Sequence, residues 1–293
     1  MRGISFCRSL AMFVCSAAFA SAAYAGPVII GGDDLTDHGS ASTYGVTNLT
    51  GWLYIEKAIG NLASNVTRPG NNGSIAALGS AASLATSSNA GAAIGSVAQK
   101  LGKTVTYYRN DTDVQTFFNQ LAASTTNPAI IWISGTDASN DFGDNVGGGA
   151  VLAPNASAIA SFVASGGGLM VHSAQYNFLT TLLPGIVITN TCQTPVTLTP
   201  AGISAFPGLT SVDVSAGPCH ASFSGQFGGL QVLGTDSGGR VVFLGGGATT
   251  TITPPTPIAS GPPSNIPTLS VWALILLSLL IGTATFAWSR RRT

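Results

Sequence analysis

Blocks of hydrophobic residues alternate with polar turns along the chain and predict strands separated by helices. Short apolar runs bounded by glycine or polar residues predict strands over 27–32, 104–108, 129–135, 168–173, 230–236 and 240–247. Between several of these runs, apolar residues recur at helical spacing over 49–66, 111–123 and 154–168. The repeated order of strand, helix and strand predicts an α/β fold with a mainly parallel sheet and helices on both faces.

Two stretches fit this pattern less well. Residues 68–98 are rich in alanine, serine, glycine and asparagine, which indicates either a loosely packed helix or a surface loop. Residues 186–227 have an irregular pattern. The last two predicted strands are joined at 236–239, where the sequence Asp-Ser-Gly-Gly predicts the turn of a hairpin.

The N-terminal segment has the pattern of a secretory signal. Arg2 and Arg8 precede or flank an apolar run over 10–20, and small residues at Ala23 and Ala25 form a cleavage site before residue 26. A retained membrane helix is the alternative, but the apolar run is short for one. We therefore expect residues 1–25 to be removed on export.

A second apolar segment lies near the C-terminus. Residues 271–288 carry no charge, and at about 1.5 Å per residue a helix of this length just crosses a hydrocarbon core about 30 Å thick. Trp272 and Trp288 lie near its ends, where indole rings favour the membrane interface. Residues 248–265 before it are rich in proline and threonine, which predicts an extended linker.

The C-terminal residues resemble a known class of sorting tail. A short motif, an apolar helix and a terminal cluster of arginines are similar to the IPTL-CTERM tails, usually written IPTLxxWG, which exosortases recognise. The matching residues are Ile266, Pro267, Thr268, Leu269, Trp272, Arg290, Arg291 and Arg292. Ala273 departs from the pattern, which has glycine there.

The resemblance of the tail implies a partner and a location. The partner would be an exosortase-like sorting peptidase in the membrane of a Gram-negative type of cell envelope. The chain would be an inner-membrane intermediate, held by the helix over 271–288, before it reaches the cell surface or the medium. An ordinary C-terminal anchor that no peptidase cleaves is the alternative.

The charge of the body, residues 26–247, excludes one class of partner. It holds six basic and eleven acidic residues, a formal charge of about −5. Binding to nucleic acid requires clustered lysine and arginine on one face, so we expect no nucleic-acid partner.

Cys192 and Cys219 are the only cysteines of the body. In an oxidising compartment we expect them to form a disulfide. Two free thiols, or half of a metal site, are the alternatives, although no Cys-x-x-Cys spacing supports a metal.

Polar clusters follow three of the predicted strands. The strand over 27–32 is followed by Asp33, Asp34, Asp37 and His38. The strand over 129–135 is followed by Asp137, Asp141 and Asp144. The strand over 168–173 ends in His172 and Ser173. In an open parallel sheet the carboxyl ends of the strands share one edge, where ligands bind. We therefore expect these side chains to converge.

Each cluster also has a simpler interpretation. The aspartates after the first strand could cap a turn, or bind a metal or substrate together with His38. Asp137, Asp141 and Asp144 offer oxygen ligands suited to Ca²⁺, but the spacing of an EF-hand is absent, so we assign no metal. His172 could be a structural, hydrogen-bonded histidine. No cofactor is indicated.

Residues 162–179 carry a second resemblance. A helix, a glycine run, a short strand and the turn Val-His-Ser-Ala resemble ThuA-like domains, which are related to class I glutamine amidotransferases and have a flavodoxin-like fold. His172 matches a histidine common at that turn. The amidotransferase elbow Gly-x-Cys-x-Gly is replaced by Val171 to Gln175, so the resemblance does not imply glutaminase activity.

Ser173 is a weak candidate nucleophile. The motif Gly-x-Ser-x-Gly is absent, and adjacent side chains in a strand, such as His172 and Ser173, point to opposite faces. Because no complete catalytic set can be assembled, the sequence favours a non-catalytic binding or display domain. The alternative is a hydrolase or carbohydrate-active enzyme that uses Asp34, Asp37, His38 and His172. We expect His220 to be a surface or loop residue.

Overall fold

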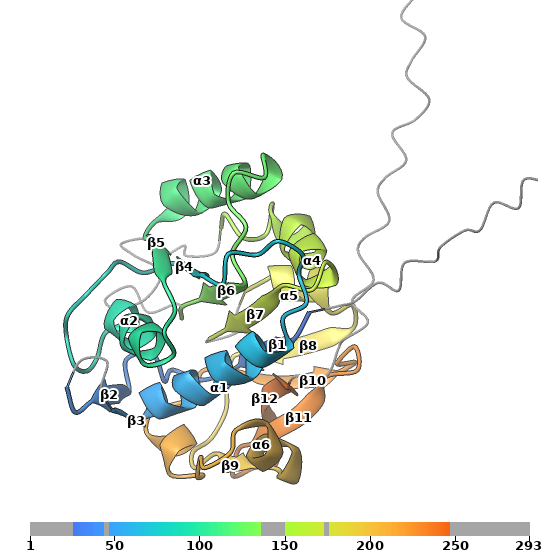
Figure 1. Cartoon of the computed structure of the whole chain (residues 1–293). Helices are drawn as coiled ribbons and strands as arrows, with labels where there is room; N and C mark the ends of the chain where they lie inside the picture. The colour runs from blue at the N-terminus through green and yellow to red at the C-terminus, as the bar shows by residue number, and fades with distance from the viewer. Residues whose placement is uncertain (1–25, 44–46, 136–149, 173–175, 247–293) are drawn as a thin grey trace, which may run out of the picture. The chain divides into compact units, whose positions relative to one another are not determined.

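A computed structural model of the chain describes residues 26–43, 47–135, 150–172 and 176–246. Within these ranges a large mixed sheet lies between two layers of helices (Figure 1). Its strands follow the order β5-β4-β6-β7-β1-β12-β10-β8. In addition, β11 pairs with β12, and β9 pairs with β11. A separate short hairpin consists of β2 (Gly39–Ala41) and β3 (Asn48–Thr50).

One half of the sheet is parallel. Its strands are β1 (Val28–Gly31), β4 (Ile75–Leu78), β5 (Val105–Tyr108), β6 (Ile130–Ile133) and β7 (Gly168–Val171). All but β5 are buried along their whole length, as expected for parallel strands covered on both faces.

The other half is antiparallel, so the sheet is mixed and the expectation of a mainly parallel sheet holds for this part only. Its strands are β8 (Ile186–Thr189), β9 (Thr197–Leu198), β10 (Ser222–Gly225), β11 (Gln231–Thr235) and β12 (Val241–Gly246). The predicted hairpin is confirmed as β11 and β12, whose tight turn reverses the chain without a crossover helix. β12 then pairs antiparallel with β1, with Val28 opposite Gly246.

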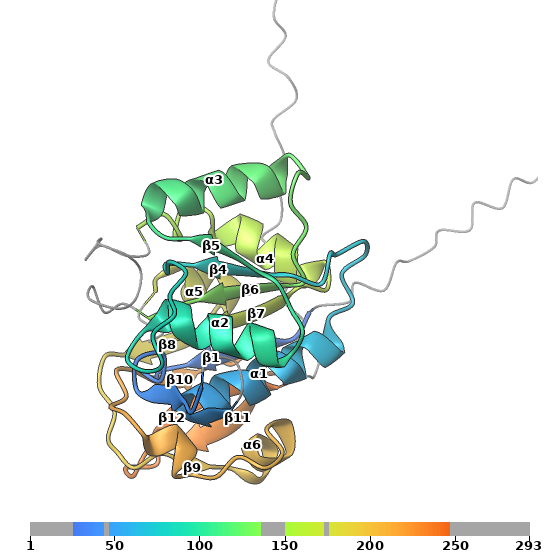
Figure 2. The same cartoon turned by 60° about the vertical axis from the view of Figure 1, so that its left-hand side comes forward.

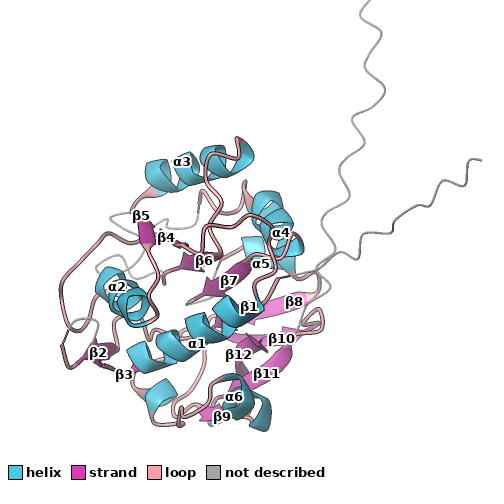
Figure 3. Ribbon diagram, in the orientation of Figure 1, coloured by secondary structure: helices cyan, strands magenta, loops and turns pink. Residues whose placement is uncertain are grey.

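Helices cover both faces of the sheet (Figures 2 and 3). The helices are α1 (Gly51–Asn65), α2 (Ala90–Lys100), α3 (Asp111–Ala122), α4 (Ala156–Ala164), α5 (Phe178–Leu182), α6 (Pro200–Ala205) and the 3₁₀ turn η1 (Asp213–Ser215). Successive strand residues point to opposite faces: Val28 and Ile30 pack with α3, α4 and α5, whereas Ile29 packs with α1, α2 and α6.

The expectation for residues 68–98, a loosely packed helix or a surface loop, holds only in part. This stretch contains β4, which lies inside the sheet, and most of α2. Small side chains give the segment a weak hydrophobic pattern, yet Ala90, Ala92 and Ala93 of α2 are fully buried against the core. Small residues let α2 pack closely against the core. The hydrophobic pattern of the sequence does not reveal this packing role.

Residues 186–227 are also more regular than expected. They hold β8, β9, α6, η1 and β10, which together build the far edge of the sheet and a flank of the molecule. These elements are short, with two to six residues each, and a hydrophobic period is hard to recognise over such lengths.

The predicted membrane helix over 271–288 lies outside the described residues, as do the signal segment and the linker. Within the ranges that the structure describes, we find no helix with the length and hydrophobicity required to cross a bilayer.

Candidate functional site

The carboxyl end of the parallel strands gathers most of the predicted site residues. Asp33 and Asp34 follow β1, and His172 follows β7, which is parallel to β1 and in register with it. The segment before β10 reaches the same edge, because Asp33 forms a bridge with Cys219 and His220 N donates to Gly32 O. Ser173, Asp137, Asp141 and Asp144 lie outside the described residues.

The convergence separates into two groups, of which the first is sealed. His172 Nδ1 lies 2.8 Å from Asp33 Oδ1, and Trp132 Nε1 donates to His172 Nε2 at 3.0 Å. The side chains of His172 and Asp33 are 0% and 2% exposed. Gly31 is required here because a β-carbon at that position would overlap the Asp33 carboxylate.

These contacts fix the protonation of His172. The indole nitrogen of Trp132 can only donate, so His172 Nε2 accepts and the ring proton is on Nδ1, from which it is donated to Asp33. Both ring nitrogens are therefore used within the core. This geometry suits a structural, positioning role for His172 better than a role as base or metal ligand.

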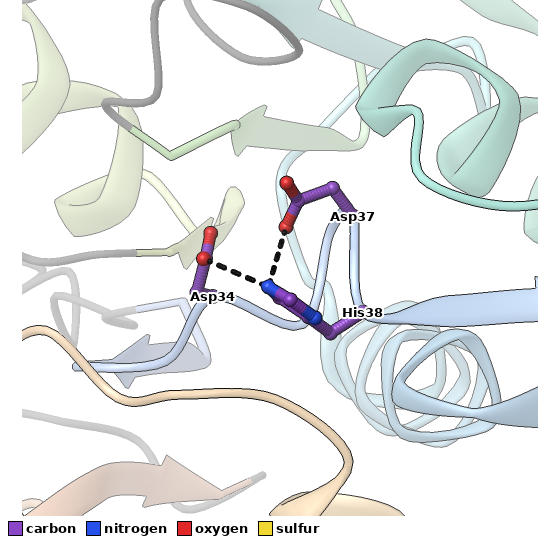
Figure 4. Close-up of side chains that lie close together, drawn as sticks. All are labelled: Asp34, Asp37 and His38. Carbon is purple, nitrogen blue, oxygen red and sulfur yellow. Dashed lines mark ion pairs between the residues drawn. The ribbon is translucent and has the colours of Figure 1, made fainter.

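The second group is open to solvent and consists of Asp34, Asp37, His38 and His220, here called the outer cluster. His38 Nε2 lies 3.3 Å from Asp34 Oδ2 and 3.6 Å from Asp37 Oδ1 (Figure 4). The His38 side chain is 38% exposed, whereas the two carboxylates are 6% and 9% exposed. Among the described residues, Asp34 Oδ1 has no hydrogen-bond partner.

His220 is a partly exposed loop residue, as expected, and it also joins the outer cluster. Its Nε2 lies 2.9 Å from Asp34 Oδ2. The hydrogen bond to Asp34 raises the pKa of His220; burial opposes this effect, and the charges of Asp34, Asp33 and Asp37 add to it. The signal for its position was its neighbour Cys219, which forms the predicted disulfide with Cys192.

Tyr54 of α1 is a buried residue that the sequence analysis did not single out. The edge of its ring faces His172, with the ring centroids 6.2 Å apart. Its hydroxyl has no hydrogen-bond partner among the described residues. Burial, and then the charge of Asp33, raises the pKa of Tyr54 well above its usual value, so the phenol stays protonated.

A groove with a volume of about 570 Å³ adjoins the outer cluster at His38. Hydroxyl-bearing and aliphatic side chains line much of it, among them Ser40, Thr50, Val196, Thr197 and Val212. His38 is its only titratable lining residue among those the structure describes. The groove is therefore suited to an uncharged ligand that offers hydroxyl groups and apolar patches.

Among the described residues, no histidine is paired with a hydroxyl or thiol nucleophile. His38, His172 and His220 contact carboxylates or Trp132, and none of them hydrogen-bonds a serine, threonine or cysteine within these ranges. The two cysteines are joined in the disulfide.

Comparison with protein families identifies the tail. The family model of the IPTL-CTERM motif matches residues 266–292. This match confirms the predicted sorting motif and indicates an exported protein that an exosortase-type enzyme processes, consistent with display at the cell surface. No curated protein and no solved structure gives a significant match, and the resemblance of the body to ThuA-like domains remains a prediction.

Proposed function

We propose that the protein is exported to the cell envelope and that its body is a binding domain, displayed on an amidotransferase-like scaffold without a nucleophile. The observation that carries the proposal is the groove at His38. It offers hydroxyl and aliphatic groups to a ligand, while the nearby histidines are tied to carboxylates instead of to an activated nucleophile.

The parallel half of the sheet supports an open α/β scaffold. Its strand order differs from that of flavodoxin, because the first strand, β1, lies at the end of this half beside β7 and not between the second and third strands, β4 and β5. Its strands run in the order β5-β4-β6-β7-β1, with helices on both faces, and the outer cluster lies beyond the carboxyl end of β1. Open α/β sheets bind ligands at this edge. Among the described residues, His38 is the only titratable residue that lines the groove. This lining favours a neutral carbohydrate over an anionic ligand.

A second candidate function is hydrolysis, and the contact of Asp34 and Asp37 with His38 favours it. Carboxylates and an imidazole in contact are the usual components of general acid and base catalysis. A panel of glycoside and ester substrates separates the two functions. Turnover that Asp34→Asn abolishes would support the enzyme, whereas saturable binding without turnover supports the binding domain.

The groove can be tested with two matched variants. Val212 is 75% exposed and lines the groove, whereas Ile203 is 56% exposed and does not line it. On an array of neutral glycans we expect Val212→Glu to lose binding and Ile203→Glu to retain it. Equal binding by both variants would remove the groove from the proposal.

Sorting can be tested separately. We expect Pro267→Ala, or deletion of Arg290 to Arg292, to leave a longer, unprocessed protein in the membrane fraction on immunoblots. Pro263→Ala, a proline change just before the motif, is the matched control and should be processed normally. Normal processing of the Pro267 variant and of the deletion would contradict exosortase sorting.

A further inference from the structure

We propose that the outer cluster binds one divalent first-row metal ion of the Zn²⁺ class through Asp34, Asp37 and His38, with His220 holding Asp34 in place as an outer-shell partner. The site goes beyond the proposed function, since a cation there is compatible with a binding domain and with an enzyme.

The spacing of the donor atoms is the first argument. One donor atom from each of Asp34, Asp37 and His38 lies within 4.8 Å of the others. His38 Nε2 is 3.3 and 3.6 Å from the two carboxylate oxygens. Ligands about 2.0 to 2.2 Å from a tetrahedral Zn²⁺ lie roughly 3.3 to 3.6 Å from one another, so His38 Nε2 is already spaced from both carboxylates as one ligand of an ion is from the next.

The environment of Asp34 is the second argument, independent of this spacing. Its side chain is 6% exposed, and Oδ1 has no hydrogen-bond partner among the described residues. Its ionic partners within those residues are two imidazoles, of His38 and His220, both at Oδ2. A buried carboxylate is costly unless it is paired or coordinates a metal, and a divalent cation would satisfy it.

The donor types select the class of ion. Two carboxylates with one imidazole form a mixed nitrogen and oxygen set, which suits Zn²⁺ and its first-row neighbours. Ca²⁺ takes six to eight oxygen ligands and Mg²⁺ favours oxygen, so neither matches a set that depends on histidine.

The backbone holds the ligands in place. His38 packs against Gly217, where a β-carbon would overlap the imidazole, and the disulfide at Cys219 fixes the segment that carries His220. Because His38 also lines the groove, a bound ion would lie at the border of the groove. There it could coordinate a hydroxyl of a molecule bound in the groove.

The test is calorimetric titration of the full exported chain, purified in detergent and stripped with EDTA, with ZnCl₂. We expect binding of one ion per chain. Asp34→Asn and His38→Gln should each weaken affinity at least about 100-fold, the upper end of the loss when an outer-shell partner of a ligand is changed. Asp213→Asn, which removes a carboxylate elsewhere, is the matched control and should bind as the wild type does.

Circular dichroism of each variant guards against misfolding, and His38→Gln is the safer variant because that side chain is 38% exposed. Absence of Zn²⁺ binding by the wild type would overturn the proposal. The proposal would also be overturned if folded Asp34→Asn or His38→Gln bound Zn²⁺ with wild-type affinity. Tighter binding of Ca²⁺ than of Zn²⁺ would overturn it as well. His220→Gln, which removes the hydrogen bond to Asp34, should weaken affinity by about 10-fold, and an unchanged value would overturn the outer-shell role of His220.

Discussion

Two groups of histidine and aspartate lie at the same edge of the sheet, and they differ in how far their imidazoles are open to solvent. In the inner group, His172 and Asp33 are sealed in the core and both imidazole nitrogens are used. In the outer cluster, His38 and His220 are more than a third exposed, and Asp34 keeps an oxygen that no described residue contacts. A sealed, hydrogen-bonded network specifies a structure, whereas an open cluster remains accessible to a ligand.

The two groups arise from neighbouring residues. Asp33 lies in extended backbone, bridged to Cys219, so the next side chain along the chain points the other way. Asp33 therefore enters the core toward His172, while Asp34 faces His38 and His220. A single change of side-chain direction separates the structural carboxylate from the binding one.

The largest effect should come from opening the inner group. We expect His172→Leu to lower the free energy of unfolding by about 3 to 5 kcal/mol, because it leaves the buried Asp33 carboxylate without its imidazole donor. The same substitution at the exposed His38 should cost no more than about 0.5 kcal/mol. Urea unfolding measures both values, and similar losses at the two positions would contradict the difference between the groups.

Removing the disulfide should have the next largest effect. The crosslink between Cys192 and Cys219 closes a loop of 27 residues. Replacing both cysteines with serine should therefore cost about 3 kcal/mol on the chain-entropy estimate. Urea unfolding of the double variant, with and without reductant, is the measurement. The wild type should fall to the stability of the variant when it is reduced; a wild type unaffected by reductant would count against a stabilising crosslink.

Asp236 offers a third comparison, a buried carboxylate paired with cationic and backbone donors. Burial alone would raise its pKa, but hydrogen bonds from Arg240 N, Arg240 Nε and Gln193 N, with the charge of Arg240, lower it. Asp236→Asn should cost about 1.5 to 3 kcal/mol at neutral pH.

The pH dependence follows from the sign of this shift. Because the folded pKa of Asp236 is lowered, its contribution is complete above the unfolded value of about 3.9 and is lost as pH falls through the folded pKa. Unfolding measured across the acid range should show a smaller loss in Asp236→Asn than in the wild type. Parallel acid limbs would contradict the assignment.

Much of the fold could be predicted because long, strongly apolar runs reveal buried parallel strands. The runs that became β1, β6 and β7 consist of large aliphatic and aromatic residues or are bounded by glycine. β4 was missed, and α2 was expected only as a loosely packed alternative to a loop. Alanine and glycine give little contrast between buried and exposed positions, although the residues themselves are buried.

The site was predicted in part, for a related reason. Asp34, Asp37 and His38 are close in sequence, so their contact is local and the strand end predicts it. The contact of His220 with Asp34 joins residues 186 positions apart, across the antiparallel half of the sheet. Such a contact depends on how β10 and β12 pair, and a single sequence carries little information on that pairing.

The pairing of β1 with β12 determines at which pole of the sheet the last described strand ends. Val28, at the start of β1, lies opposite Gly246, at the end of β12, so the first and last described strands begin and finish at one pole. Asp34 and His38 follow the other end of β1. The end of β12 and the edge that carries the outer cluster thus lie at opposite poles of the sheet.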